Sequence, residues 1–124
     1  METFKKAERL NGKKKIEFLV KKGNSFSVFP LRVLWKEQQS DIIPAVQVVI
    51  SVPKKNFKKA VDRNKIKRRI REAYRKNKKT LYEHLESENK KIMLMLIFSD
   101  KERPEYKLVE KKVAEILQKL IKKT

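Results

Sequence analysis

The chain is 124 residues long, enough for one domain with a core of its own, and it contains no cysteine. The missing cysteines exclude disulfide frameworks, thiol nucleophiles and metal sites held by thiolates. Its 34 Lys and Arg residues stand against 15 Asp and Glu, a formal net charge of +19 that indicates an anionic partner, usually nucleic acid.

The chain begins with a predicted short helix. Residues 13–22 place Ile16, Leu19 and Val20 on one side, the spacing of an amphipathic helix. Gly23 follows two lysines and predicts the end of this helix.

Two extended segments come next. Residues 26–36 alternate in polarity over their second half, and Pro30 indicates that the first half is an edge strand or a bulge. Residues 45–52 alternate valine or isoleucine with other residues, the pattern of a strand that ends at Pro53.

A long helix is predicted from about 63 to about 85, with Asp62 as its N-cap. Residues 92–98 are seven apolar residues in a row and predict a strand buried on both faces. Pro104 opens a last amphipathic helix over about 105–122.

The order helix, strand, strand, helix, strand, helix predicts an α/β (α+β) fold. We expect a two-layer sandwich in which a small mixed sheet is packed with helices, formed as one domain by residues 1–124. The strands before and after the long helix should be parallel neighbours or near neighbours. The general rule for such crossovers predicts a right-handed connection.

Positive charge is concentrated in residues 54–79, which hold fourteen Lys and Arg against two acids, a net +12. On the expected helix, spacings of three and four residues align five polar side chains opposite the apolar stripe. These are Asn64, Arg68, Arg71, Arg75 and Lys79. Like charges at these spacings destabilise a helix, so phosphates of a nucleic acid are expected to complete this face.

The sequence lacks the residue patterns of a protein-based active site. His84 is the single histidine, and two glycines cannot make a glycine-rich phosphate loop. No segment reaches the roughly 20 apolar residues of a membrane-spanning helix. We therefore expect a cytoplasmic nucleic-acid-binding protein without a membrane partner, a catalytic side chain or a tightly bound metal.

The stretch KKAVDRNKIKRRIREAY, residues 58–74, resembles the signature of the bacterial ribonuclease P protein subunit. The shared features are a basic residue before Ala-Val, an Arg-Asn-basic triplet, and Lys-Arg and Arg-Glu pairs one helical turn apart. Lys65 stands where the family has a second arginine, which keeps the charge and loses the planar donor fork. The similarity extends over nearly the whole chain, beginning near Arg9 and Leu10.

The resemblance implies the family's small α/β sandwich, with a left-handed crossover around the signature helix. It also implies endonucleolytic removal of the 5′ leader from precursor tRNA, catalysed by an RNA subunit that holds Mg2+. The protein would form a 1:1 complex with that RNA and supply no catalytic side chain.

The resemblance further implies two RNA-binding surfaces. The signature helix would dock on the catalytic RNA through Lys59, Arg63, Asn64, Lys65, Lys67, Arg68, Arg71 and Arg75. A cleft between the first helix and the sheet would hold the single-stranded 5′ leader, lined by Ile16, Phe18, Val20, Trp35, Ser51, Lys54 and Lys55.

Other classes of function stay open on the sequence. A ribosomal protein or general RNA chaperone would carry the same charge without a nuclease role, and it would not lower the magnesium demand of the catalytic RNA. A protein-only nuclease would cleave precursor tRNA unaided, which the missing carboxylate cluster argues against. A DNA-binding domain could place the long helix in a major groove, although no dimer interface is evident.

Overall fold

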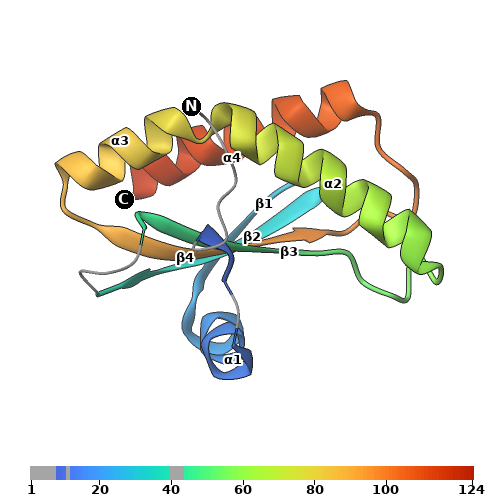
Figure 1. Cartoon of the computed structure of the whole chain (residues 1–124), viewed down its shortest axis with the longest axis horizontal. Helices are drawn as coiled ribbons and strands as arrows, with labels where there is room; N and C mark the ends of the chain where they lie inside the picture. Colours follow the sequence, from blue (N-terminus) through green and yellow to red (C-terminus); the bar gives the residue numbers. More distant parts are fainter. Residues whose placement is uncertain (1–7, 11, 40–43) are drawn as a thin grey trace.

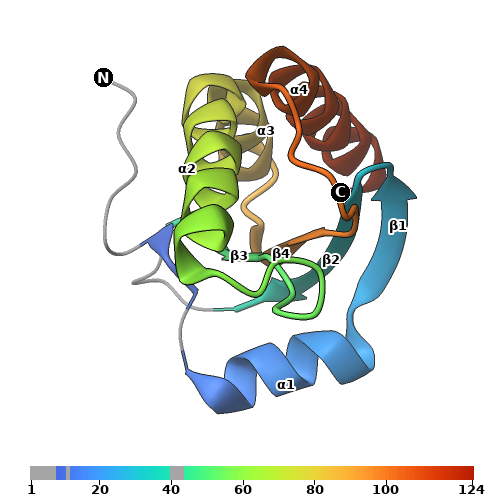
Figure 2. The same ribbon diagram turned by 90° about the vertical axis from the view of Figure 1, so that its right-hand side faces the viewer.

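The computed structural model describes residues 8–10, 12–39 and 44–124, which form four helices and one four-stranded sheet (Figure 1). The elements in chain order are α1 (Lys13–Lys22), β1 (Asn24–Val28), β2 (Leu31–Gln38), β3 (Val46–Ser51), α2 (Ala60–Asn77), α3 (Lys79–Ser87), β4 (Lys91–Phe98) and α4 (Tyr106–Lys123). The predicted sandwich is confirmed: α2, α3 and α4 cover one face of the sheet, and α1 lies against the other (Figures 1 and 2).

The strand order is β1-β2-β4-β3, and only the β3–β4 pair is parallel. The predicted parallel pairing of the strands around the long helix is thus confirmed. Seen from the helix-covered face with β3 and β4 pointing upward, β4 lies to the left of β3 (Figures 1 and 2). The crossover is therefore left-handed, as the family resemblance implied and against the general right-handed preference.

Two predicted elements are divided in the structure. The extended segment 26–36 is a hairpin of β1 and β2 that turns at Phe29–Pro30, a cis peptide bond. The helix expected over 63–85 bends at Lys78, which separates α2 from α3. Lys78 keeps helical dihedral angles (φ −73°, ψ −22°), so the apolar spacing continues through the bend and the sequence pattern does not reveal it.

The start of α2 also differs from the prediction. The helix begins at Ala60, with Lys59 at the N-cap position, so Asp62 lies in the first turn and is not the cap. Its carboxylate accepts a hydrogen bond from Arg103, in the loop before α4. The acid still lies near the positive end of the helix dipole, where it is stabilising.

The sheet has an apolar core on each face. The larger core joins the inner side chains of the strands to those of α2, α3 and α4. The smaller core, on the face against which α1 packs, consists of Leu10, Leu19, Leu34 and Met93. We call this second sheet face the α1 face. In the described part of the chain, no helix is both long and apolar enough to cross a lipid bilayer.

Gly23 fixes the contact between α1 and the sheet. Its amide donates a hydrogen bond to the carbonyl oxygen of Leu19 at 2.8 Å, and a Cβ here would press against that oxygen and lie 2.9 Å from Leu19 Cδ1. Because backbone must shift to relieve this overlap, Gly23→Ala should lower the free energy of unfolding by about 1–3 kcal/mol in urea titrations. The exposed Lys22→Ala should change it by less than about 0.5 kcal/mol. Equal stability of the two variants would contradict the steric argument.

Candidate nucleic-acid interface

The orientation of α2 follows from its apolar stripe. Ile66, Ile70, Ala73 and Tyr74 are buried in the larger core. Each large apolar side chain buried in this way contributes roughly 1.5–3 kcal/mol, so rotation of the helix about its axis would be costly. The polar side chains of α2 are consequently held facing outward.

The outward side of α2 is a cationic surface, which we call the α2 ridge. Its members are Asn64, Lys65, Lys67, Arg68 and Arg71, all exposed or half-buried, together with Lys59, which is exposed at the N-cap position just before the helix. In the part of the chain that the structure describes, no carboxylate lies within ion-pair distance of Lys65, Lys67 or Arg68. The structure therefore brings these predicted residues together on one side of the helix.

Three cations predicted for this surface are placed differently. Arg63 donates 2.8 Å hydrogen bonds to the carbonyl oxygens of Phe57 and Lys58, so it closes the loop before α2. Arg75 forms a 2.6 Å ion pair with Glu72, and this hydrogen bond lowers the pKa of the Glu72 carboxyl. Lys79 begins α3 beyond the bend and leaves the line of the ridge.

A pocket of about 350 Å³ lies between α2 and β3, and we call it the α2–β3 pocket. Its lining residues are Arg9, Leu10, Val48, Val49, Ile50, Lys67 and Arg71. Partial burial and the nearby guanidinium groups of Arg9 and Arg68 lower the pKa of Arg71. Arg9 was not among the predicted site residues, because nothing in the local sequence relates it to a helix more than fifty residues away.

Several residues predicted for leader binding lie on or beside the α1 face. Ile16 is half-buried against the smaller core, and Val20 is 55% exposed. Ser51 ends β3 on the same side of the sheet, paired in register with Ile97, and Lys54 and Lys55 are exposed in the loop that follows.

The predicted leader-binding residues of α1 lie on two flanks of that helix. The helix crosses beneath the sheet from the β3 edge to the β1 edge (Figure 2). Ile16 and Val20, four residues apart, lie on the same flank of this helix. Phe18, two residues from either, projects from the opposite flank because successive residues rotate by about 100°. Phe18 is 45% exposed, as expected of a contact residue.

The prediction that Trp35 lines the leader cleft is wrong. Trp35 is only 8% exposed and belongs to the larger core, beneath the helices on the other face of the sheet. Phe29 is an exposed aromatic side chain outside the predicted leader-cleft residues. It is 67% exposed in the β1–β2 turn, and the adjoining Pro30 carbonyl accepts a 2.8 Å hydrogen bond from the amide of Ser99, just beyond β4. Phe29 thus lies at the same end of the sheet as Ser51.

A second group of cations lies at the end of α4. Lys119, Lys122 and Lys123 surround the half-buried ring of Phe26, and the Lys123 ammonium is 5.4 Å from the ring centroid. Cations in a last helical turn are stabilised by the helix dipole, which accounts for this cluster without an RNA partner.

Comparison with known proteins finds similar chains of one family. Residues 4–121 match the family model described as Ribonuclease P. A ribonuclease P protein component from Porphyromonas gingivalis is 34% identical over 86% of this chain and 77% of its own length, and one from Chlorobium phaeobacteroides is 29% identical over 95% and 88%. The solved Thermotoga maritima RNase P protein is 26% identical with a TM-score of 0.71, over 90% of this chain and 96% of that one. The Staphylococcus aureus RNase P protein, at 24% identity, has the same fold with a TM-score of 0.72 over 93% and 96%.

Proposed function

The chain belongs to the ribonuclease P protein family, and from this premise we propose that its α2 ridge binds the catalytic RNA while its α1 face binds the 5′ leader of precursor tRNA. As a ribonuclease P protein component, it is an RNA-binding subunit of a ribonucleoprotein endoribonuclease that processes tRNA. Each chain has one α2 ridge and one α1 face, so the stoichiometry that we propose is a 1:1 complex with the RNA. The proposed place of action is the cytoplasm, where a cysteine-free, cationic protein can meet RNA under reducing conditions.

The α2 ridge is the observation that carries the assignment to the catalytic RNA. Among the described residues, no carboxylate lies within ion-pair distance of its members Lys65, Lys67 and Arg68, and RNA phosphates would relieve the repulsion between these cations. Arg68 and Arg71 can each present a planar donor fork to phosphate oxygens.

Binding of the leader has a simple energetic reason. Precursor and mature tRNA differ by the leader, so contacts to the leader favour substrate over product. In the proposed arrangement Lys54 and Lys55 bind leader phosphates and Ser51 offers a hydroxyl. Phe29, rather than Trp35, supplies an exposed ring on which an unpaired base can stack.

The Mg2+ needed for cleavage is proposed to be held by the RNA. Within residues 8–10, 12–39 and 44–124, no three His, Asp or Glu side chains gather as metal ligands would. A cationic ridge would repel a divalent cation in any case. The proposed role of the protein is to bring anionic RNAs together.

Reconstitution with the catalytic RNA tests this assignment. The wild-type protein should lower the Mg2+ concentration needed to cleave precursor tRNA. Arg68→Ala and Arg71→Ala should each weaken RNA binding roughly tenfold, the loss of one charge-assisted contact of about 1.5 kcal/mol, and should raise the Mg2+ demand.

Lys122→Ala, which removes a charge in the last turn of α4 and outside the α2 ridge, is the matched control and should behave as wild type. Unchanged binding by both arginine variants would remove the α2 ridge from the RNA interface. A wild-type protein without effect on the Mg2+ demand would favour the ribosomal or chaperone alternative.

A further inference from the structure

We propose that the α2–β3 pocket binds one phosphate group of the RNA that docks on α2, and that Glu8 is the positioning residue that holds Arg9 in this pocket. The inference rests on the proposed function, since the catalytic RNA supplies the phosphate. It adds Arg9 to the interface and gives the buried Glu8 a role in RNA binding.

The pocket has the chemistry of a phosphate site. Lys67 and Arg71 come from one face of α2, four residues apart, and Arg9 comes from the segment that runs beside β3. The apolar residues Val48 and Val49 contribute to its wall, and none of its described lining residues is acidic. Two guanidinium groups and one ammonium can thus meet the same anion, and guanidinium forks match phosphate oxygens.

The electrostatics favour an anion at this position. The pKa of Arg71 is lowered by its partial burial and by the positive charges of Arg9 and Arg68, which means that the cations repel each other there. A phosphate between them would convert this repulsion into attraction. The pocket is walled in part by apolar side chains, so the attraction would be screened less than on an open surface.

Arg9 is fixed from both sides along the chain. On one side, the amide of Leu10 donates a 2.8 Å hydrogen bond to the Val48 carbonyl oxygen, and the Leu10 side chain lies in the smaller core. On the other side, Glu8 is only 4% exposed. The Nζ atom of Lys78 donates hydrogen bonds of 3.0 and 2.8 Å to its two carboxylate oxygens.

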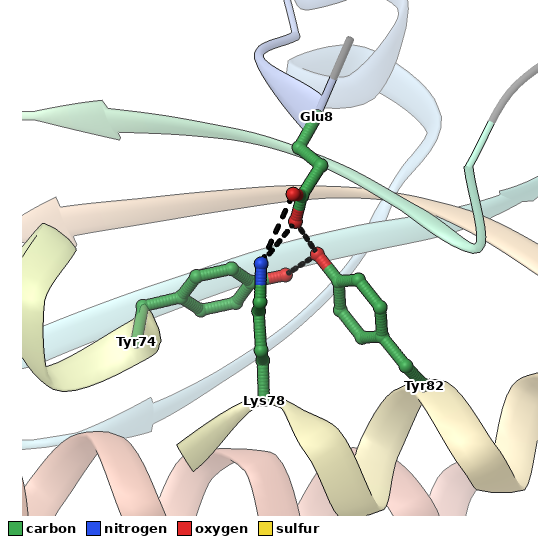
Figure 3. A network of polar contacts seen from close by, with 4 residues as sticks. All are labelled: Glu8, Tyr74, Lys78 and Tyr82. Carbon is green, nitrogen blue, oxygen red and sulfur yellow. Dashed lines mark hydrogen bonds and ion pairs between the residues drawn. The ribbon is translucent and has the colours of Figure 1, made fainter. Parts of the chain in front are cut away.

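Two tyrosines complete the Glu8 anchor (Figure 3). The Tyr82 hydroxyl donates a hydrogen bond to Glu8 and lies 2.8 Å from the Tyr74 hydroxyl. Burial raises the pKa of both tyrosines, so both hydroxyls stay protonated at the pH values at which RNA binding is measured. Burying an ion pair contributes little net stability but can fix geometry. Here it fixes the N-terminal segment against the bend between α2 and α3.

A double-mutant cycle on binding to the catalytic RNA tests the pocket. Arg9→Ala and Arg71→Ala should each weaken binding roughly tenfold. The double variant should bind the RNA about ten- to thirtyfold more weakly than wild type. This is well short of the hundredfold product of the two single effects, because both side chains bind the same phosphate. As a matched control, Arg9→Ala combined with Lys65→Ala on the α2 ridge should give the full product of the two single losses.

The role of Glu8 is tested by a second cycle. In a Glu8→Gln background, Arg9→Ala should have almost no further effect, whereas Arg68→Ala should keep its full effect. If Glu8 had a purely structural role, Glu8→Gln would weaken the Arg9 and Arg68 contacts alike. That result would overturn the positioning role of Glu8. If Glu8→Gln does not fold, the Glu8→Leu/Lys78→Met pair replaces it as the background.

The outcomes separate this inference from the proposed function. If Arg9→Ala binds the catalytic RNA with wild-type affinity, or if its effect adds fully to that of Arg71→Ala, the proposed phosphate site in the pocket is overturned. The α2 ridge is judged separately, by the effect of Arg68→Ala. A wild-type protein that does not bind the catalytic RNA would overturn both.

Discussion

Raising the salt concentration from 50 to 200 mM is expected to weaken binding of this protein to the catalytic RNA by on the order of a thousandfold. The α2 ridge and the α2–β3 pocket together offer about six cations to RNA phosphates, which are Arg9, Lys59, Lys65, Lys67, Arg68 and Arg71. Each phosphate that is neutralised releases condensed counterions, and added salt opposes this release. Affinities measured at several salt concentrations, with Mg2+ held constant, give the number of contacts from the slope of log affinity against log salt.

The same measurement distinguishes a defined surface from diffuse attraction by a charge of +19. Lys122→Ala combined with Lys123→Ala removes two charges at the end of α4 and should leave the slope unchanged. Arg68→Ala combined with Lys65→Ala removes two charges from the α2 ridge and should reduce the slope by about one to two. Equal slopes for the two double variants would show that the protein binds by total charge alone, against the proposed interface.

The α2 ridge could be predicted because its determinants are local. Helical spacing fixes which side chains of residues 60–77 share a face, and the buried stripe of Ile66 and Ile70 fixes which face is outward. Arg75 belongs to the same pattern and Arg63 to the same signature stretch, yet their partners are a neighbouring acid and two loop carbonyls. Spacing predicts direction, whereas hydrogen-bond partners depend on the path of the adjoining chain.

The residues that were misplaced depend on contacts distant in sequence. The alternation of Leu31, Val33 and Trp35 correctly groups these side chains on one face of β2. Nothing in that alternation says whether α1 or the three other helices will cover the face. Arg9 reaches the α2–β3 pocket only through pairing with Val48 and through the Glu8–Lys78 ion pair, so it could not be assigned from its own neighbourhood.

The buried ion pair should have the largest effect on stability. Lys78→Met with Glu8 retained is expected to lower the free energy of unfolding by about 3–5 kcal/mol, because a buried carboxylate would lose its charged partner. Urea titrations in about 0.2 M salt, which screens the net charge beyond roughly a Debye length, measure this loss. The neighbouring Lys79→Met removes an exposed charge and should change stability by less than about 0.5 kcal/mol. Similar values for the two variants would mean that Lys78 is not a buried partner of Glu8.

Replacing both partners separates folding from RNA binding. Glu8→Leu with Lys78→Met removes the buried charges together, and the Tyr74 and Tyr82 hydroxyls can still bond each other, so stability should return to within about 1–2 kcal/mol of wild type. RNA affinity should not return with it. An apolar pair supports the core but lacks the directed hydrogen bonds that fix the segment beside β3, so Arg9 should lose its place in the α2–β3 pocket. A folded double variant that binds RNA about as weakly as Arg9→Ala would show that the ion pair is retained for the position of Arg9, while full recovery of affinity would assign it to the fold alone.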